Sequence, residues 1–201
     1  GVTYPKPNVS NAQIRDLWKR VAEDYLPFNI NVTTDRRVYE AAPANSRQRC
    51  VFSPSISAMP SGAAGVAYIG SWDWGSDTVC WSIYISGKSG AEVGSHELGH
   101  TLTLGHDGDS SSGYYAGHGS GAVGWAPIMG AGYYKNVVQW CKGEYTGANN
   151  TQDDLAVMSS NGATPMTDDA ADSAAAASRI EPGTLDGLVS SPSDTDWFRF
   201  T

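Results

Sequence analysis

Apolar residues recur at helical spacing between residues 11 and 26. They occupy positions i, i+3, i+4, i+7 and i+11, which line one face of an α-helix, and they are Ile14, Leu17, Trp18, Val21 and Tyr25. Ser10 and Gln13 form a capping-box pattern before this run. Pro27 ends it, because the residue before a proline is disfavoured in helical conformation. The pattern predicts an amphipathic helix whose apolar face lies in the core.

Alternation of apolar and polar residues predicts β-strands in the rest of the first half. Residues 28–34 alternate in this way, and further strands are expected around residues 50–52 and over residues 78–86. Residues 62–70 are rich in glycine and alanine, which lets another backbone approach closely. Loops are expected at residues 40–48 and 108–126, a tight turn at 126–130, and a short helix at 151–158 capped by the Thr151–Asp154 run.

The segment before residue 106 predicts a second long helix that carries chemistry. Ser89-Gly90-Ala91-Glu92 matches a capping box, and Gly105 can adopt the left-handed turn that ends a helix. Inside the helix, His96 and His100 stack on one face because they are four residues apart. Two such imidazoles hold one Zn²⁺ at about 2.0–2.1 Å each.

Two further residues extend this zinc pattern. Glu97 follows His96 and projects beside the metal, where a carboxylate takes a proton from bound water. His106 lies six residues beyond His100, so the chain must turn for it to become the third ligand. Solvated histidines on a surface helix are the simpler alternative, but three of the four histidines in 201 residues fall in this one window. The window predicts a catalytic zinc site.

Composition and charge narrow the class of protein. A chain of 201 residues is long enough for one domain plus an appendage. The net charge of −8 argues against a nucleic-acid partner, and no apolar run approaches the ~20 residues that span a membrane. Residues 1–25 do not resemble a signal peptide, and the chain begins with Gly1, so we expect a mature form trimmed from a longer precursor. A secreted monomer is expected.

The three cysteines form no metal-binding CxxC pattern. Low lysine content with many Tyr, Trp, Gly and Ser residues favours a secreted protein, where one disulfide and one remaining thiol fit the count. We favour a Cys50–Cys80 disulfide, which closes a modest loop in one half of the chain. Cys141 then stays free, pairs between molecules, or binds a metal.

The amino-acid composition of the chain changes near residue 161. Aspartates at 168, 169 and 172 lead into four alanines, Pro, Gly and Ser punctuate the rest, and residues 194–201 resume strand-like alternation. We therefore divide the chain into a domain at residues 1–160 and an extension at residues 161–201. The extension is either a linker with a truncated β-module or a β-tail packed on the main domain.

The motifs resemble those of the metzincin zinc endopeptidases. The string HExxHxxxxxH is followed 23 residues later by Met129 in a turn. Asp107 after the third histidine resembles the reprolysin (adamalysin-like) branch. The Gly65–Ile69 run, the Trp125–Gly130 run and the Gln139–Tyr145 region are similar to secreted bacterial members. This resemblance covers residues 11–158, and residues 168–201 resemble the start of a bacterial prepeptidase C-terminal domain.

The resemblance implies an α/β (α+β) fold and a function. A twisted mixed sheet with an active-site helix would precede an irregular C-terminal subdomain that carries the Met-turn, with Met129 beneath the metal. The resemblance implies that an antiparallel edge strand binds the substrate backbone, and that a second segment forms a wall of the substrate pocket. These substrate-binding residues are Ala64, Gly65, Val66, Ala67 and Tyr68 in the edge strand, and Trp125, Ala126 and Pro127 in the pocket wall.

The expected activity is that of a secreted zinc metalloendopeptidase, made with an inhibitory propeptide and acting on protein or peptide substrates. His96, His100 and His106 would bind the zinc, and Glu97 would act as general base. Tyr133 or Tyr134 could assist as an oxyanion donor, although packing is the simpler role for both. His118 could contact substrate or a second metal, but a solvated or hydrogen-bonded role is favoured. Five aspartates could bind Ca²⁺, although solvated carboxylates are the default, and they are Asp73, Asp77, Asp109, Asp153 and Asp154.

The chain departs from the family pattern in two places. Thr103 stands where the family has glycine, and a β-branched residue tolerates positive φ badly. Either Gly105 makes the turn towards His106 or Thr103 carries strain. Only nine residues precede Ser10, so the first strand of the family sheet is absent or replaced by the N-terminus.

Two rival functions remain open. One is a zinc-containing extracellular binding or adhesion module without turnover, against which the presence of Glu97 speaks. The other is an enzyme whose third ligand is a carboxylate, for which Glu144 is the candidate.

Overall fold

The computed structural model describes residues 3–57, 59–181, 183–184, 187–189, 191 and 193–200. Its α-helices are α1 (Asn11–Asp24), α2 (Arg36–Ala41), α3 (Gly87–Thr101) and α4 (Asp154–Ser160). Its strands are β1 (Arg49–Phe52), β2 (Gly65–Val66), β3 (Val79–Ser82), β4 (Trp125–Pro127), β5 (Val137–Gln139), β6 (Ser178–Arg179) and β7 (Phe198–Arg199). Three 3₁₀ turns are η1 (Ala44–Ser46), η2 (Gly121–Val123) and η3 (Gly132–Tyr134). The mixed α+β class expected from the resemblance is confirmed.

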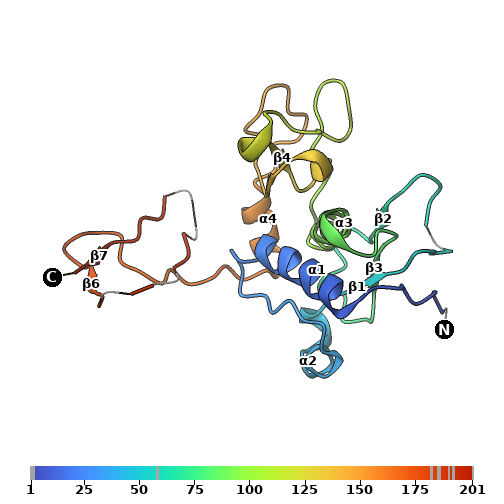
Figure 1. Ribbon diagram of the computed structural model, residues 1–201, viewed down its shortest axis with the longest axis horizontal. Helices are drawn as coiled ribbons and strands as arrows, with labels where there is room; N and C mark the ends of the chain where they lie inside the picture. The colour runs from blue at the N-terminus through green and yellow to red at the C-terminus, as the bar shows by residue number, and fades with distance from the viewer. Residues whose placement is uncertain are drawn as a thin grey trace.

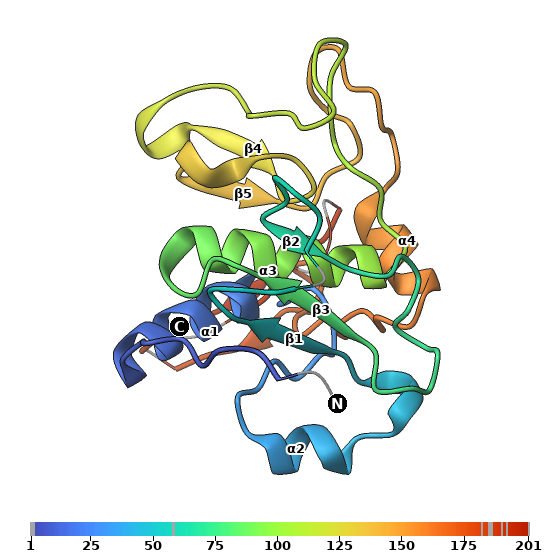
Figure 2. The same cartoon turned by 90° about the vertical axis from the view of Figure 1, so that its right-hand side faces the viewer.

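Helix α1 forms where the apolar spacing predicts it. The Gln13 amide donates to Ser10 Oγ at 3.2 Å, and the Ser10 amide donates to Gln13 Oε1 at 2.9 Å, so the capping box is complete. Val21 and Tyr25 are buried, and the Tyr25 hydroxyl donates to the Ser95 carbonyl at 3.0 Å. Helix α1 therefore packs against α3, as Figure 2 shows.

The central sheet has the strand order β1–β3–β2. Strands β1 and β3 are parallel, and β2 is antiparallel to β3 at the edge. The strand expected around residues 50–52 is confirmed as β1, and the one expected over residues 78–86 is confirmed in shorter form as β3. The antiparallel edge strand expected at Ala64–Tyr68 is confirmed in shorter form as β2.

The prediction of a strand at residues 28–34 is wrong. Only Phe28 makes a β-bridge there, to Pro165, and the Val32 carbonyl accepts instead from Trp18 Nε1 at 2.7 Å. Ile30 and Val32 pack against the core. The alternation arises because one side of an irregular segment is buried, without a neighbouring strand.

Helix α3 begins earlier than its capping-box pattern predicts. Ser86 is the N-cap, without a side-chain hydrogen bond, and the helix starts at Gly87. Ser89 and Gly90 therefore lie inside the helix, and the Glu92 carboxylate pairs with Lys88 one turn away. The predicted Ser89–Glu92 cap is wrong, because this lysine satisfies Glu92.

Small residues allow α3 to be buried although it has no apolar stripe. A Cβ added at Gly90 would lie 2.9 Å from Leu17 Cδ1, and one at Gly94 would lie 2.8 Å from Phe52 Cζ. Helix α1 and strand β1 thus approach the helix backbone itself. Figure 2 shows α3 between α1 and the pair of strands β4 and β5. These two strands are parallel to each other.

The end of α3 is made by Thr103, not by Gly105. Thr103 has φ of +79°, in the left-handed region, and Gly105 does not have a positive φ. The Leu104 amide donates to the Gly99 carbonyl at 3.1 Å and the Thr103 amide to the His100 carbonyl at 2.9 Å, which is a Schellman motif. Of the two alternatives for this turn, the strained Thr103 is the one adopted. Its hydroxyl donates to Asn161 Oδ1 at 3.1 Å.

Thr103 gives a testable stability prediction. Thr103→Gly should be more stable than Thr103→Ala by about 1 kcal/mol, because only glycine avoids the Cβ cost of a left-handed residue. Both variants lose the hydroxyl, so the bond to Asn161 cancels in the comparison. Urea unfolding of the two variants measures the difference, and the usual order, with alanine more stable than glycine, would contradict the left-handed turn.

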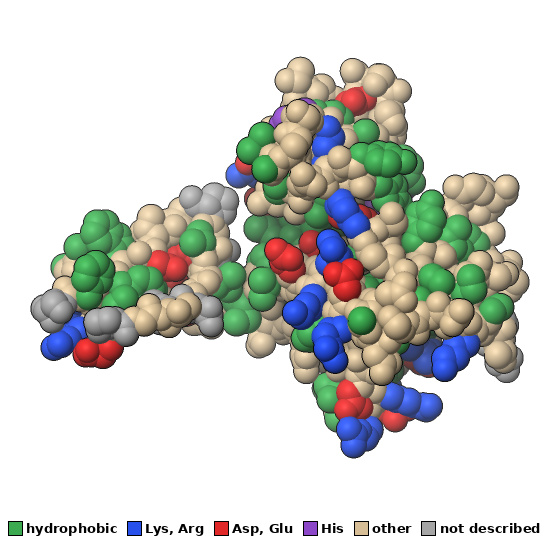
Figure 3. All heavy atoms as spheres, in the orientation of Figure 1, with side chains coloured by type: hydrophobic (Ala, Val, Ile, Leu, Met, Phe, Trp, Pro, Cys, Tyr) green, Lys and Arg blue, Asp and Glu red, His purple; other side chains and the backbone are tan. Residues whose placement is uncertain are grey.

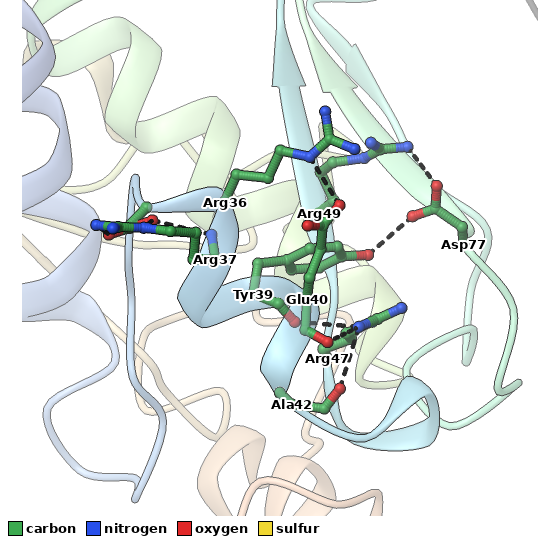
Figure 4. Close-up of polar contacts among 9 residues, drawn as sticks. Arg36, Arg37, Tyr39, Glu40, Ala42, Arg47, Arg49 and Asp77 are labelled. Atoms are coloured by element: carbon green, nitrogen blue, oxygen red, sulfur yellow. Dashed lines mark hydrogen bonds and ion pairs between the residues drawn. The ribbon is translucent and has the colours of Figure 1, made fainter.

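Helix α2 was not predicted, and only its last two residues overlap the loop expected at residues 40–48. Figure 4 shows Arg47 pointing at the end of α2, where it donates to the carbonyls of Tyr39, Glu40 and Ala42 at 3.2, 2.9 and 3.1 Å. The same guanidinium lies 4.7 Å from the centre of the Tyr39 ring. A short helix without an apolar stripe is thus held by one later arginine.

The last part of the main body carries the turn and helix that were expected. The Gly130 amide donates to the Pro127 carbonyl at 3.1 Å, which confirms a tight turn within residues 126–130. Helix α4 is capped by Asp153, whose side chain accepts from the Ala156 amide at 3.1 Å, so the cap lies two residues later than Thr151.

The C-terminal extension leaves the main body after residue 166. The Met166 amide donates to the Pro27 carbonyl at 2.9 Å, and the segment bearing the parallel pair β6–β7 then extends away from the rest, as Figure 1 shows. In Figure 3 basic and acidic side chains are interspersed over α1 and α2, where Arg20 pairs with Asp16 and Arg36 with Glu40. No helix among the described residues has the length and apolarity needed to cross a membrane.

Candidate metal centre and active site

Three imidazoles converge at the end of α3. His96 and His100 lie one turn apart on the helix, and the Thr103 turn brings His106 back to them. One ring nitrogen of each lies within 4.8 Å of the others, and His100 Nε2 is 3.0 Å from His106 Nε2. His96 and His100 are buried and His106 is exposed, so the cluster opens to solvent on the His106 side.

Backbone carbonyls hold two of these rings in the form that binds metal. His96 Nδ1 is 3.0 Å from the Ile128 carbonyl, and His100 Nδ1 is 2.8 Å from the Leu104 carbonyl. A carbonyl can only accept, so each Nδ1 carries the proton and each Nε2 presents a lone pair. Burial lowers the pKa of His96 to about 3 and that of His100 to about 4, so both are neutral at pH 7.

The donor set fits a zinc ion. Two nitrogens at 2.0–2.1 Å from one tetrahedral zinc lie roughly 3.3 Å apart. His100 Nε2 and His106 Nε2 lie at nearly that spacing, 3.0 Å, and the lone pair of His100 Nε2 faces the other ring. A cation placed between the two rings could be bound by both nitrogens. The histidine group is therefore able to bind a metal.

Glu97 lies next to this cluster without a fixed partner. Its side chain is 6% exposed, and no described residue hydrogen-bonds to its carboxylate. Burial raises the pKa of Glu97 to about 8. Edge strand β2 packs directly on it, since a Cβ added at Gly65 would overlap Glu97 Oε1 and come within 2.6 Å of Glu97 Cγ. The carboxylate is thus confined near the metal ligands but remains available to a proton donor.

Met129 is fully buried beside the histidine helix. A Cβ added at Gly99 would lie 2.8 Å from Met129 Sδ, so the sulfur packs on α3 between the turns that carry His96 and His100. The Met129 carbonyl accepts from the Asp107 amide at 2.9 Å. The Met129 segment and the residue after the third histidine are therefore directly joined.

A buried polar group behind His106 was not predicted as a unit. Cys141 Sγ donates to Asp107 Oδ2 at 3.2 Å, and the Cys141 amide donates to Asp154 Oδ2 at 2.9 Å. Burial raises the pKa of Asp154 to about 8 and also raises that of Asp107. Asn150 Nδ2 donates to Asp107 Oδ1 at 3.1 Å. This group ties the third histidine to the start of α4, and no spacing in the sequence indicates it.

The hydroxyl nearest to the histidines comes from Tyr114, which sequence reasoning missed. Tyr114 Oη is 3.2 Å from His106 Nε2, and the two ring centres are 4.3 Å apart. Of the tyrosines considered instead, Tyr134 is 94% exposed, and Tyr133 packs on Tyr84 with ring centres 6.1 Å apart. The only sequence signal for Tyr114 was an aromatic pair, Tyr114-Tyr115, within a loop of Gly and Ser.

The predicted substrate-binding residues lie in two places, at the edge of the central sheet and in β4. Gly65 and Val66 form β2, and Ala64, Ala67 and Tyr68 flank it at the sheet edge. Trp125 is half-buried, whereas Ala126 and Pro127 are buried.

Cys50 and Cys80 are directly opposite on the parallel strands β1 and β3, and both thiols are free. Facing residues on neighbouring strands lie at Cα separations compatible with a disulfide. The disulfide stays a prediction.

His118, Asp77 and Asp109 have ordinary hydrogen-bond partners. His118 Nδ1 is 3.1 Å from Tyr115 Oη, in agreement with the favoured hydrogen-bonded role. Asp77 accepts from Tyr39 and Arg49 at 2.8 Å each, as Figure 4 shows, and Asp109 accepts from Ser111 and Ser112 within its own turn. Among the described residues, the five aspartates considered for Ca²⁺ do not gather into one group.

One comparison with known proteins gives a match. Residues 28–107 match the family model described as metallo-peptidase family M12B, reprolysin-like. This segment is less than half of the chain, but it contains the central sheet, α3, Glu97 and all three clustered histidines. The match supports a reprolysin-like metalloprotease, a class that is zinc-dependent. A comparison with curated proteins found no match.

Proposed function

We propose that this chain is a secreted zinc-dependent endopeptidase that hydrolyses peptide bonds in proteins. The observation that carries the proposal is the convergence of His96, His100 and His106, with Glu97 unpaired beside them. The M12B match supports the same class of enzyme. Secretion rests on the composition alone and is part of the proposal.

In the proposed mechanism each residue has a distinct role. His96, His100 and His106 would hold the zinc, which supplies Lewis acidity towards water and the substrate carbonyl. Glu97 accepts the proton of the attacking water and delivers it to the leaving amine. Its position matters here, because the carboxylate lies buried beside the histidines and no described residue hydrogen-bonds to it, so it is free to take and return a proton.

The peptide would lie along β2. This strand is bonded to β3 on one side only, so its other edge can pair with an extended substrate. Gly65 would then place the scissile bond close to Glu97, since no side chain stands between the β2 backbone and that carboxylate. Trp125, Ala126 and Pro127 are proposed to support one wall of the cleft, and Met129 the base of the metal site.

Four finer assignments belong to the same proposal. A Cys50–Cys80 disulfide would form in an oxidising compartment, and mass spectrometry after thiol alkylation would detect it or show two free thiols.

Residues 161–201 would be a separate extension, which limited proteolysis should remove before it cuts within residues 90–130. An inhibitory propeptide is expected in the precursor, and the enzyme is expected to be monomeric.

Zinc analysis combined with a protease assay tests the proposal. The purified protein should hold one zinc per chain and hydrolyse casein, a strong chelator should abolish hydrolysis, and added Zn²⁺ should restore it. Zinc without hydrolysis would favour the binding or adhesion module. A His106→Ala variant that keeps its zinc, while Glu144→Ala loses it, would favour the carboxylate ligand instead. If the purified protein holds no zinc and does not hydrolyse casein, the proposal is overturned.

A further inference from the structure

The Tyr114 side chain reaches the metal-binding face of the histidine cluster. Its oxygen is 3.2 Å from His106 Nε2, the same nitrogen that lies 3.0 Å from His100 Nε2. The Tyr114 ring lies over that of His96 as well, with centres 6.0 Å apart and planes inclined by 29°. The hydroxyl therefore lies at the cluster and not merely at the edge of one ring.

The separation of these atoms is that of two ligands on one metal. An oxygen and a nitrogen, each about 2.0–2.1 Å from a tetrahedral zinc, are roughly 3.3 Å apart. Tyr114 Oη and His106 Nε2 are 3.2 Å apart. Three imidazoles leave one position of a tetrahedral zinc unfilled. Among the described residues outside the triad, Tyr114 is the one whose side chain contacts a ring nitrogen of this cluster.

The backbone of Tyr115, directly after Tyr114, is fixed to the active site. The Tyr115 amide donates to the Asp107 carbonyl at 2.7 Å, and the Tyr115 carbonyl accepts from the Ala131 amide at 2.9 Å. A Cβ at Gly130 would lie 2.5 Å from the Tyr115 carbonyl oxygen, so this approach requires the glycine. Tyr114 is thereby held between the residue after the third histidine and the segment after Met129.

The side chain itself is less confined than its backbone. Tyr114 is 47% exposed, and among the described residues its hydroxyl has a hydrogen bond only with His106. Rotation about its side-chain bonds would carry the ring into solvent without breaking the Tyr115 backbone bonds. A group anchored in this way can occupy a position and also leave it.

We propose that Tyr114 is a fourth, displaceable ligand of the centre formed by His96, His100 and His106. In the absence of substrate its oxygen binds the metal and its phenol proton passes to solvent. A peptide carbonyl then replaces it, the oxygen takes up a proton again, and the ring turns outward. This inference rests on the proposed function, because it requires that the histidines hold a metal.

The test uses Cu²⁺ and Zn²⁺ as probes with three forms of the full chain: the unaltered protein, Tyr114→Phe and Tyr115→Phe. Tyr115 is a matched control in the same loop, because its hydroxyl contacts His118 and not the triad. The Cu²⁺-loaded protein and Tyr115→Phe should show a phenolate-to-copper charge-transfer band in visible light, and Tyr114→Phe should lack it. The Zn²⁺ dissociation constant, from competition with a chromogenic chelator, should rise roughly tenfold or more in Tyr114→Phe only.

The outcomes separate this inference from the proposed function. If all three proteins bind metal through the histidines with the same spectrum and affinity, the Tyr114 role is overturned and the metal centre stands. If the unaltered protein binds neither metal, the proposed function itself fails. Displacement has its own readout: saturating peptide added to Cu²⁺-loaded Glu97→Gln should weaken the band, and a band that persists would overturn a displaceable ligand.

Discussion

Replacing Glu97 by glutamine is expected to abolish nearly all peptide hydrolysis while the zinc stays bound. Glutamine has almost the same shape as glutamate, so the packing of β2 on this side chain is preserved. It cannot accept a proton from water, however. The catalytic rate constant should fall by about 10²–10⁴-fold, the usual contribution of a general base, whereas zinc content and thermal stability should stay close to those of the unaltered protein.

Glu92→Gln is the matched control for this experiment. Glu92 is the other buried glutamate of α3, at 8% exposure against 6% for Glu97, but its carboxylate pairs with Lys88. Hydrolysis of a fluorogenic peptide and zinc content should be measured together in both variants. Loss in Glu97→Gln but not in Glu92→Gln is expected. Full activity in Glu97→Gln would sink the general-base mechanism, even if zinc is present.

Adding one methyl group at Gly65 should also cost most of the activity. A Cβ there would overlap Glu97 Oε1 and lie 2.6 Å from both Glu97 Cγ and Val93 Cγ1. The flexible carboxylate is the group most able to move, so Gly65→Ala should push the general base away from the metal ligands. Misplacement by about 1 Å costs roughly 10²-fold in rate, and we expect a loss of that size with the zinc retained.

Zinc analysis and thermal unfolding distinguish this effect from simple misfolding. Gly183→Ala serves as the control, because a Cβ at Gly183 meets nothing within 4 Å, and it should behave like the unaltered protein. Gly65→Ala should keep its zinc and a cooperative unfolding transition. Wild-type activity in a folded Gly65→Ala protein would show that β2 does not confine Glu97.

Helix α3 illustrates why the hydrophobic pattern predicted some elements and not others. Helix α1 carries its apolar face in its own sequence, so spacing alone located it. Helix α3 is buried through glycines at 90, 94 and 99, against which Leu17, Phe52 and Met129 pack. The glycines indicate that another part of the chain packs closely on the helix backbone, but they do not indicate which part. Its start at Gly87 was missed for a related reason, since Glu92 is satisfied by Lys88 rather than by a cap.

The strands show the opposite limitation. The alternation at residues 28–34 is as clear as that at 78–86, yet only the second pairs with neighbouring strands. Alternation reports that one side of an extended segment is buried. Whether its amides find another strand depends on distant segments, and Val32 is instead bonded to Trp18.

The sequence by itself determined the parts of the site that depend on local geometry. His100 lies four positions after His96 and Glu97 lies one position after it, so helical spacing alone places them together. The tertiary structure decided what depends on long-range closure: the left-handed Thr103 that returns His106, the Asp107–Cys141–Asp154 group, and Tyr114 at the cluster. Backbone bonds join Asp107 to Met129 and Tyr115 to Ala131, and so hold the loop after His106 against the Met129 segment. No short-range pattern encodes these bonds.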